Sequence, residues 1–110
     1  MSLHLSHSGD VVVVEVEGQL IVSNRQELKQ RVLDEAEGGA RKILVDFAKT
    51  GYIDSAGLGV LVSLAKRMRE LGGDLRLANL NDDLRTLFEL TKLDTLFQIA
   101  DSREQALAAF

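Results

Sequence analysis

The residues with the clearest potential for chemistry form the run Asp54-Ser55-Ala56-Gly57-Leu58-Gly59, at the start of a strongly helical pattern. A serine at a helix N-terminus faces backbone N–H groups without partners and the positive end of the helix dipole. Those donors would favour a phosphate built on the Ser55 hydroxyl. The small or absent side chains of Ala56, Gly57 and Gly59 would leave the first turn open to another backbone. Ser55 is therefore a candidate phosphorylation site, and residues 54–59 are a candidate surface for binding a partner protein.

Helix capping is the simpler interpretation of the same run. Asp and Ser are both preferred N-cap residues, and a lost cap costs about 1 kcal/mol. Gly57 and Gly59 would then serve only to let the helix pack closely on a sheet. The two interpretations are compatible, because one serine can both cap a helix and accept a phosphate.

An enzymatic role for Ser55 lacks the other residues it would need. A serine nucleophile needs a base within reach. The only histidines, His4 and His7, lie in or beside the first predicted strand. The Gly-x-Ser-x-Gly nucleophile motif is also absent, since residue 53 is Ile. We expect no enzymatic activity.

Two ligand-binding alternatives are also weak. Gly57-Leu58-Gly59 lacks the third glycine of a dinucleotide-binding fingerprint, because residue 62 is Val, and no Walker lysine follows. Asp46 and Asp54, with no third acidic residue at the first strand, make a poor Mg²⁺ site for a phospho-receiver protein. We expect neither a cofactor nor a metal.

Composition restricts the class of protein further. The chain has 110 residues, 45% of them hydrophobic, which fits one domain over residues 1–110. Its net charge of −4 does not favour binding to nucleic acid. Lys66, Arg67 and Arg69 are expected at the end of a helix, where cations are favoured. The sequence has no cysteine, no signal-peptide pattern and no apolar run of membrane-spanning length. We therefore expect a cytoplasmic protein.

The elements that must position Ser55 can be predicted from periodicity and from glycine. The predicted order is β-β-α-β-α-β-α-β-α, an α/β fold with a mixed, mostly parallel sheet of about five strands and about four helices. Strands are expected at 3–5, 11–17, 42–47, 74–78 and 96–99, and helices are expected to begin at Ser23 or Asn24, at Asp54-Ser55, at Asn81 or Asp82, and at Ser102. Gln26 or Glu27 would complete a capping box in the first helix. Residues 48–57 would form a long loop beyond a strand end, where such sheets bind ligands.

One known family combines these features in the same order. The segment Val45-Asp46-Phe47, followed by Tyr52-Ile53-Asp54-Ser55-Ala56-Gly57-Leu58-Gly59-Val60-Leu61, resembles the signature of STAS domains, the anti-sigma factor antagonists. Further similarity extends over residues 16–20, 72–75, 87–94 and 104–107. The resemblance therefore covers nearly the whole chain.

The resemblance implies a regulatory mechanism with Ser55 as a substrate. In the family, the unphosphorylated protein binds an anti-sigma factor that is also a serine kinase of the histidine-kinase-like ATPase type, and a sigma factor is released. The kinase phosphorylates the serine that corresponds to Ser55, the complex dissociates, and a phosphatase resets the protein. On this basis the chain has no catalytic residue of its own.

One departure from the family pattern lies near the predicted switch. Ile21, followed by Val22, stands where members often have an acidic residue. We expect Ile21 and Val22 to present an apolar surface to the partner. The same pair keeps an alternative open, in which the chain is a non-switching STAS subunit of a signalling scaffold or of a lipid-transport complex.

Overall fold

The computed structural model describes all of residues 1–110 and contains one five-stranded mixed sheet in the order β1-β2-β3-β4-β5. β1 (Ser2–Ser8) and β2 (Val11–Leu20) form an antiparallel hairpin. β2, β3 (Lys42–Ile53), β4 (Asp74–Ala78) and β5 (Ile99–Ala100) run parallel to one another. Parallel neighbours need a crossover connection, so helices alternate with these strands. The predicted fold class and element order are confirmed.

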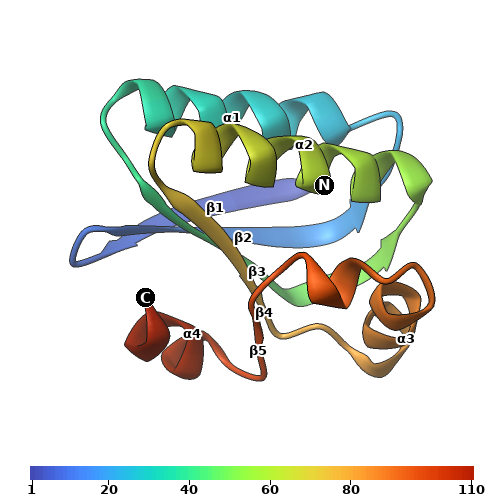
Figure 1. Ribbon diagram of the computed structural model, residues 1–110. Coiled ribbons are helices and arrows are strands. Elements are labelled where there is room, and N and C mark those ends of the chain that lie inside the picture. The colour runs from blue at the N-terminus through green and yellow to red at the C-terminus, as the bar shows by residue number, and fades with distance from the viewer.

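Four α-helices cover the sheet from both sides. They are α1 (Arg25–Glu37), α2 (Ser55–Glu70), α3 (Asp82–Leu90) and α4 (Arg103–Ala109), and a short 3₁₀ helix, η1 (Leu93–Thr95), follows α3. Figure 1 shows α1 and α2 side by side over one face, while α4 lies on the opposite face near the C-terminus. The two faces therefore carry different amounts of helix.

Alternate side chains of β2 enter two separate hydrophobic clusters, one on each face of the sheet. Val12, Val14 and Val16 join the large cluster beneath α1 and α2, whereas Val11 and Val13 join a small cluster with Ala106 of α4. Successive strand side chains point to opposite faces, so an all-valine run can supply both cores. In α2, Leu61, Leu64 and Met68 recur at helical spacing and are buried against the sheet. This burial holds the start of α2 in place.

β3 continues well beyond its predicted end at residue 47. Phe47, Thr50 and Ile53 are all buried, and the pairing with β2 continues to Leu20 and Ile53 through two register shifts. The Thr50 hydroxyl donates a 2.7 Å hydrogen bond to the carbonyl of Val16. Bulges of this kind change the spacing of buried residues along the strand from two to three. The segment therefore lacks the two-residue pattern that predicts a strand. The predicted loop over residues 48–57 is therefore wrong.

Two smaller predictions also differ from the structure. The last strand is Ile99–Ala100 instead of 96–99, because the chain first turns through η1. The predicted capping box of α1 does not form. Asn24 is the N-cap residue, but its carboxamide accepts from Ile21 N–H at 2.9 Å and donates to the Gln19 carbonyl at 2.9 Å. The Asn24 side chain thus orders the turn before α1.

Candidate functional site

The junction between β3 and α2 is built around Asp54. Asp54 is the N-cap of α2, and its Oδ1 accepts a 2.8 Å hydrogen bond from Gly57 N–H. Its Oδ2 accepts a 3.0 Å hydrogen bond from Val22 N–H, in the turn between β2 and α1. Its own N–H donates to the Leu20 carbonyl at 3.1 Å. Asp54 therefore joins two segments that are far apart in the sequence into one surface.

The same hydrogen bonds keep the Asp54 carboxylate charged. The Gly57 N–H lowers the pKa of Asp54 most, partial burial opposes this, and the Val22 and Ala56 N–H groups and the charge of Arg25 lower the pKa further. Hydrogen bonds to an ionised carboxylate favour that form. The site consequently carries a fixed negative charge at the start of α2, where it also complements the helix dipole.

Ser55 is the first residue of α2 and is exposed to solvent. Asp54, and not Ser55, caps the helix, so the hydroxyl plays no part in holding the helix end. The Gly57 N–H is already bonded to Asp54. It is therefore not free to bind a phosphate on Ser55, contrary to the expectation from the helix start alone. Ser55 is thus exposed at the start of the helix and directly follows the capping aspartate in the chain.

The two glycines in the first turns of α2 face different surroundings. A Cβ on Gly57 would lie 2.5 Å from the Leu20 carbonyl oxygen and 2.9 Å from Cγ2 of Ile53. Gly57 therefore allows α2 to approach the end of β2, and it faces the interior instead of a partner. A Cβ on Gly59 would meet no atom within 4 Å, so this position is open. Leu58, also predicted to bind the partner, is 8% exposed and belongs to the core.

An exposed apolar pair completes the surface. Val22 is 63% exposed, and Tyr52, which pairs with Gln19 across the sheet, is 54% exposed. Val22 lies in the turn that bonds Asp54, and Tyr52 lies two residues before Asp54, so both belong to the surroundings of this junction. Val22 and the half-buried Ile21 were predicted for this site, but Tyr52 was not. The signal for Tyr52 was present in the sequence, since it is the only tyrosine and lies three residues before Ser55.

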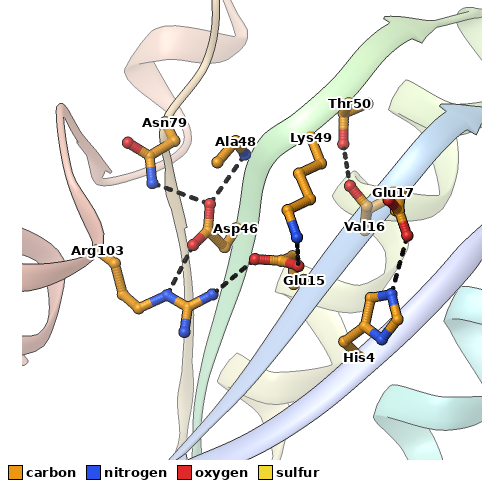
Figure 2. A network of polar contacts seen from close by, with 10 residues as sticks. All are labelled: His4, Glu15, Val16, Glu17, Asp46, Ala48, Lys49, Thr50, Asn79 and Arg103. Carbon is orange, nitrogen blue, oxygen red and sulfur yellow. Dashed lines mark hydrogen bonds and ion pairs between the residues drawn. The ribbon is translucent and has the colours of Figure 1, made fainter.

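A second polar cluster lies on the face of the sheet that carries α4, and Figure 2 shows its contacts. Asp46 is 2% exposed, and its Oδ1 accepts 2.9 Å hydrogen bonds from Ala48 N–H and from the Asn79 amide. Its Oδ2 accepts from Arg103 Nε at 2.8 Å. Arg103 also reaches Glu15 at 3.0 Å. This cluster fixes the first residue of α4 to two strands of the sheet.

Opposing effects set the ionisation of Asp46. Burial raises its pKa, but the hydrogen bonds from Asn79, Ala48 and Arg103 together outweigh burial, so the pKa lies below its ordinary value. A buried carboxylate with this many donors is satisfied and not reactive. We therefore assign Asp46 to the fold, consistent with the weak case for a metal site at Asp46 and Asp54.

Other functional classes find little support in the geometry. His4 and His7 lie on β1, an edge strand separated from β3 by β2, and His4 bonds Glu17 at 3.0 Å. No three or more His, Asp or Glu side chains are grouped in a way that would hold a metal ion. No helix has both the length and the apolar character needed to cross a bilayer.

Comparison with known proteins identifies the class to which this fold and site belong. A family model for the STAS domain matches residues 2–106. The chain superposes on a crystal structure of a Thermotoga maritima protein with a TM-score of 0.92 at 29% identity, covering 97% of this chain and 92% of the other. The phosphorylated form of SpoIIAA from Bacillus superposes with a TM-score of 0.76 at 19% identity, covering 98% of each chain, which is a likeness of fold. The chain belongs to the STAS domain family.

Sequence relatives place the chain more narrowly. The anti-sigma-B factor antagonist of Bacillus subtilis is 32% identical over 93 residues, which cover 84% of this chain and 84% of that protein. The chain is thus a member of the anti-sigma factor antagonists, which are regulatory proteins and not enzymes, and which bind anti-sigma factors. The family predicted from the Asp54–Gly59 signature is confirmed.

Proposed function

We propose that this chain is an anti-sigma factor antagonist whose binding is switched off by phosphorylation of Ser55. In its unphosphorylated form it binds an anti-sigma factor that is also a serine kinase of the histidine-kinase-like ATPase type, and a sigma factor is released. Phosphorylation ends the complex, and a phosphatase restores the unphosphorylated form. Because sigma factors act on RNA polymerase, this function belongs in the cytoplasm.

The observation that carries the proposal is the exposed Ser55 hydroxyl at the first position of α2, beside the Asp54 cap. A kinase can reach this hydroxyl without opening the fold. In the reaction the Ser55 oxygen attacks the γ-phosphorus of ATP, the hydroxyl proton passes to a base on the kinase, and ADP leaves. Val22 and Tyr52, both exposed and both close to Asp54 in the turn or in the chain, offer the kinase apolar contacts.

The added charge is large enough to separate the two proteins. A phosphoserine carries a charge of roughly −1.5 to −2 at neutral pH. Two like unit charges about 4 Å apart repel by roughly 4 kcal/mol at an effective dielectric constant near 20. That energy corresponds to nearly a thousandfold in affinity. A phosphate on Ser55 that faces an acidic group of the partner can therefore release the partner without any refolding of the chain. The charge of Asp54 adds to this repulsion.

The proposal is tested with two variants and the partner kinase. Ser55→Ala should bind the kinase as the native chain does and should not be released by ATP. Ser55→Asp should bind at least roughly tenfold more weakly, given the charge it adds. Phosphopeptide mapping after incubation with kinase and Mg-ATP should place the phosphate on Ser55 and not on Ser63 of the same helix. Equal affinities for the two variants, or a phosphate elsewhere, would overturn the proposal.

A second candidate is a non-switching STAS subunit in a signalling scaffold or a lipid-transport complex. It is favoured by Ile21 and Val22, because an apolar turn with Val22 63% exposed suits a permanent contact. Mass spectrometry of the protein isolated from its own cells separates the two functions. The switching function requires a phosphorylated fraction at Ser55, and the non-switching function requires none.

A further inference from the structure

A groove between α1 and α2 begins close to Ser55. It holds about 590 Å³ and is open to solvent. Its lining includes Lys29 and Leu33 of α1 and Gly59, Val62, Lys66 and Arg67 of α2. Gly59 lies one helical turn after Ser55, and the absence of a side chain there leaves this end of the groove open.

A second hollow extends the groove towards the C-terminal ends of the two helices. This hollow of about 260 Å³ shares Leu33 and Arg67 with the first and extends to Arg41 and Leu71. From Gly59 to Leu71 the helix rises about 18 Å, at 1.5 Å per residue. An elongated, open channel of this length suits a segment of polypeptide better than a compact small molecule.

The chemistry of the groove specifies the kind of segment. Leu33 and Val62 are only partly buried and offer apolar contacts at the groove, while Lys29, Lys66 and Arg67 supply positive charge. Each hollow also has one acidic side chain, Glu70 in the larger one, 3.9 Å from Arg67, and Glu37 in the smaller one, so cations remain in excess over the two hollows. The chain as a whole has a net charge of −4, so this local excess of cations contrasts with the rest of the molecule. Complementary charge of this sort selects a partner and speeds its association.

We propose that the groove between α1 and α2 binds an acidic, leucine-containing segment of the anti-sigma factor. This inference rests on the proposed function, because the occupant is part of the protein that phosphorylates Ser55. Continuity between the groove and the Ser55 surface lets one partner contact both. The groove supplies affinity that is independent of the phosphate, and Ser55 supplies the switch.

A synthetic peptide tests the groove separately from the switch. The probe is a fluorescent 12-residue peptide of repeated Glu-Leu-Leu-Glu units, and its counterpart carries Gln in place of Glu. Titration of the full chain, followed by amide chemical shifts and fluorescence anisotropy, should show binding of the Glu peptide with shifts at Gly59 and Ser63. Binding should weaken with added salt, and the Gln peptide should bind more weakly.

Variants of the groove make the test specific. Lys29→Glu combined with Lys66→Glu should weaken binding of the Glu peptide by roughly tenfold, the scale expected when attractive charge pairs become repulsive. Gly59→Leu should fill the open end of the groove and also weaken binding, without straining the helix. Arg31→Glu is the matched control, because Arg31 is exposed on α1 but does not line the groove. It should leave affinity for the peptide nearly unchanged.

The outcomes separate the groove from the switch. Ser55→Asp should still bind the Glu peptide, whereas it should lose the partner kinase. Failure of the Glu peptide to bind, or equal losses in the groove variants and in Arg31→Glu, would overturn the groove proposal and leave the switch untouched. Equally tight binding of single-stranded DNA to the groove would also overturn it, since the site would then recognise phosphate backbones.

Discussion

Asp46 lies within β3 and Asp54 directly follows its last residue, and their carboxylates are held in different ways. Asp46 is 2% exposed and is bonded by the Asn79 amide, the Ala48 N–H and the Arg103 guanidinium. Asp54 is half-buried, and the hydrogen bonds to its carboxylate come from backbone N–H groups. One aspartate bonds the side chain of a distant helix residue, and the other orders a surface.

The difference shows how a structural carboxylate can be told from one that supports a binding site. Both side chains are charged and both have a lowered pKa, so ionisation alone does not distinguish them. The degree of burial and the neighbouring groups distinguish the two carboxylates. Asp46 is surrounded by the groups it bonds, whereas Asp54 lies next to an exposed hydroxyl, a bare backbone turn and exposed apolar side chains. We expect changes around Asp46 to affect stability and changes around Asp54 to affect binding.

The largest effect on folding should come from Arg103→Ala. The variant should lose about 3 kcal/mol of unfolding free energy, because the buried Asp46 carboxylate keeps its charge without its cation. Urea unfolding at neutral pH measures the loss. Arg85→Ala is the control, since Arg85 pairs with the exposed Asp101 and should cost less than about 1 kcal/mol. Equal losses in the two variants would contradict the structural role of Asp46.

Gly57→Ala should have the next largest effect on folding. The added Cβ would lie 2.5 Å from the Leu20 carbonyl oxygen, so the start of α2 must shift, at a cost of about 2 kcal/mol. Gly59→Ala is the matched change two residues further on. It should raise stability by up to about 1 kcal/mol, because alanine favours the helix and meets nothing. Thermal unfolding measures both effects. Equal changes of melting temperature in the two variants would contradict the different surroundings of Gly57 and Gly59.

A smaller effect should appear as a dependence on pH. The folded-state pKa of Asp46 lies below its ordinary value of 3.8, so its contribution is complete above that pH and is lost as the pH falls through the folded pKa. The urea midpoint of the native chain should therefore fall more steeply below pH 3.8 than that of Asp46→Asn. Parallel curves for the two proteins in this range would show that Asp46 is not favourably ionised.

The smallest effect on folding, with a clear effect on binding, should come from Asp54→Ala. The N-cap is lost at a half-buried position, so the urea midpoint should shift much less than in Arg103→Ala. The hydrogen bond to Val22 N–H is lost as well, so phosphorylation of Ser55 by the partner kinase should slow several-fold. Asp54→Asn, which keeps an acceptor, should be intermediate. A normal rate in Asp54→Ala would remove any role for Asp54 in presenting Ser55.

Much of the fold could be predicted because local signals agreed. The apolar spacing of α2 and the N-cap residues Asp54, Asn81 and Ser102 mark elements that depend on neighbours in the sequence. The contact between Asp46 and Arg103 could not be predicted, since 57 positions separate them and neither residue belongs to a local motif. The continuation of β3 was missed because its bulges break the two-residue alternation.

The candidate site was predictable only in part, for a related reason. Ser55 and Asp54 are recognisable from helix-start chemistry and from the family signature. Whether a neighbouring residue faces outward depends on the approach of β2, which places Gly57 against Leu20 and leaves Gly59 open. Tyr52 is exposed because of the local register with Gln19, and that register follows from bulges that no local pattern reveals.

The division of labour at the start of α2 has a consequence for the lifetime of the protein in the cell. Asp54 caps the helix, so the phosphorylation proposed for Ser55 would break no hydrogen bond that stabilises the native state. The marked and unmarked populations should then resist proteolysis equally well. Under the proposed switch, repeated phosphorylation and dephosphorylation of Ser55 would leave the rate of degradation of the protein unchanged.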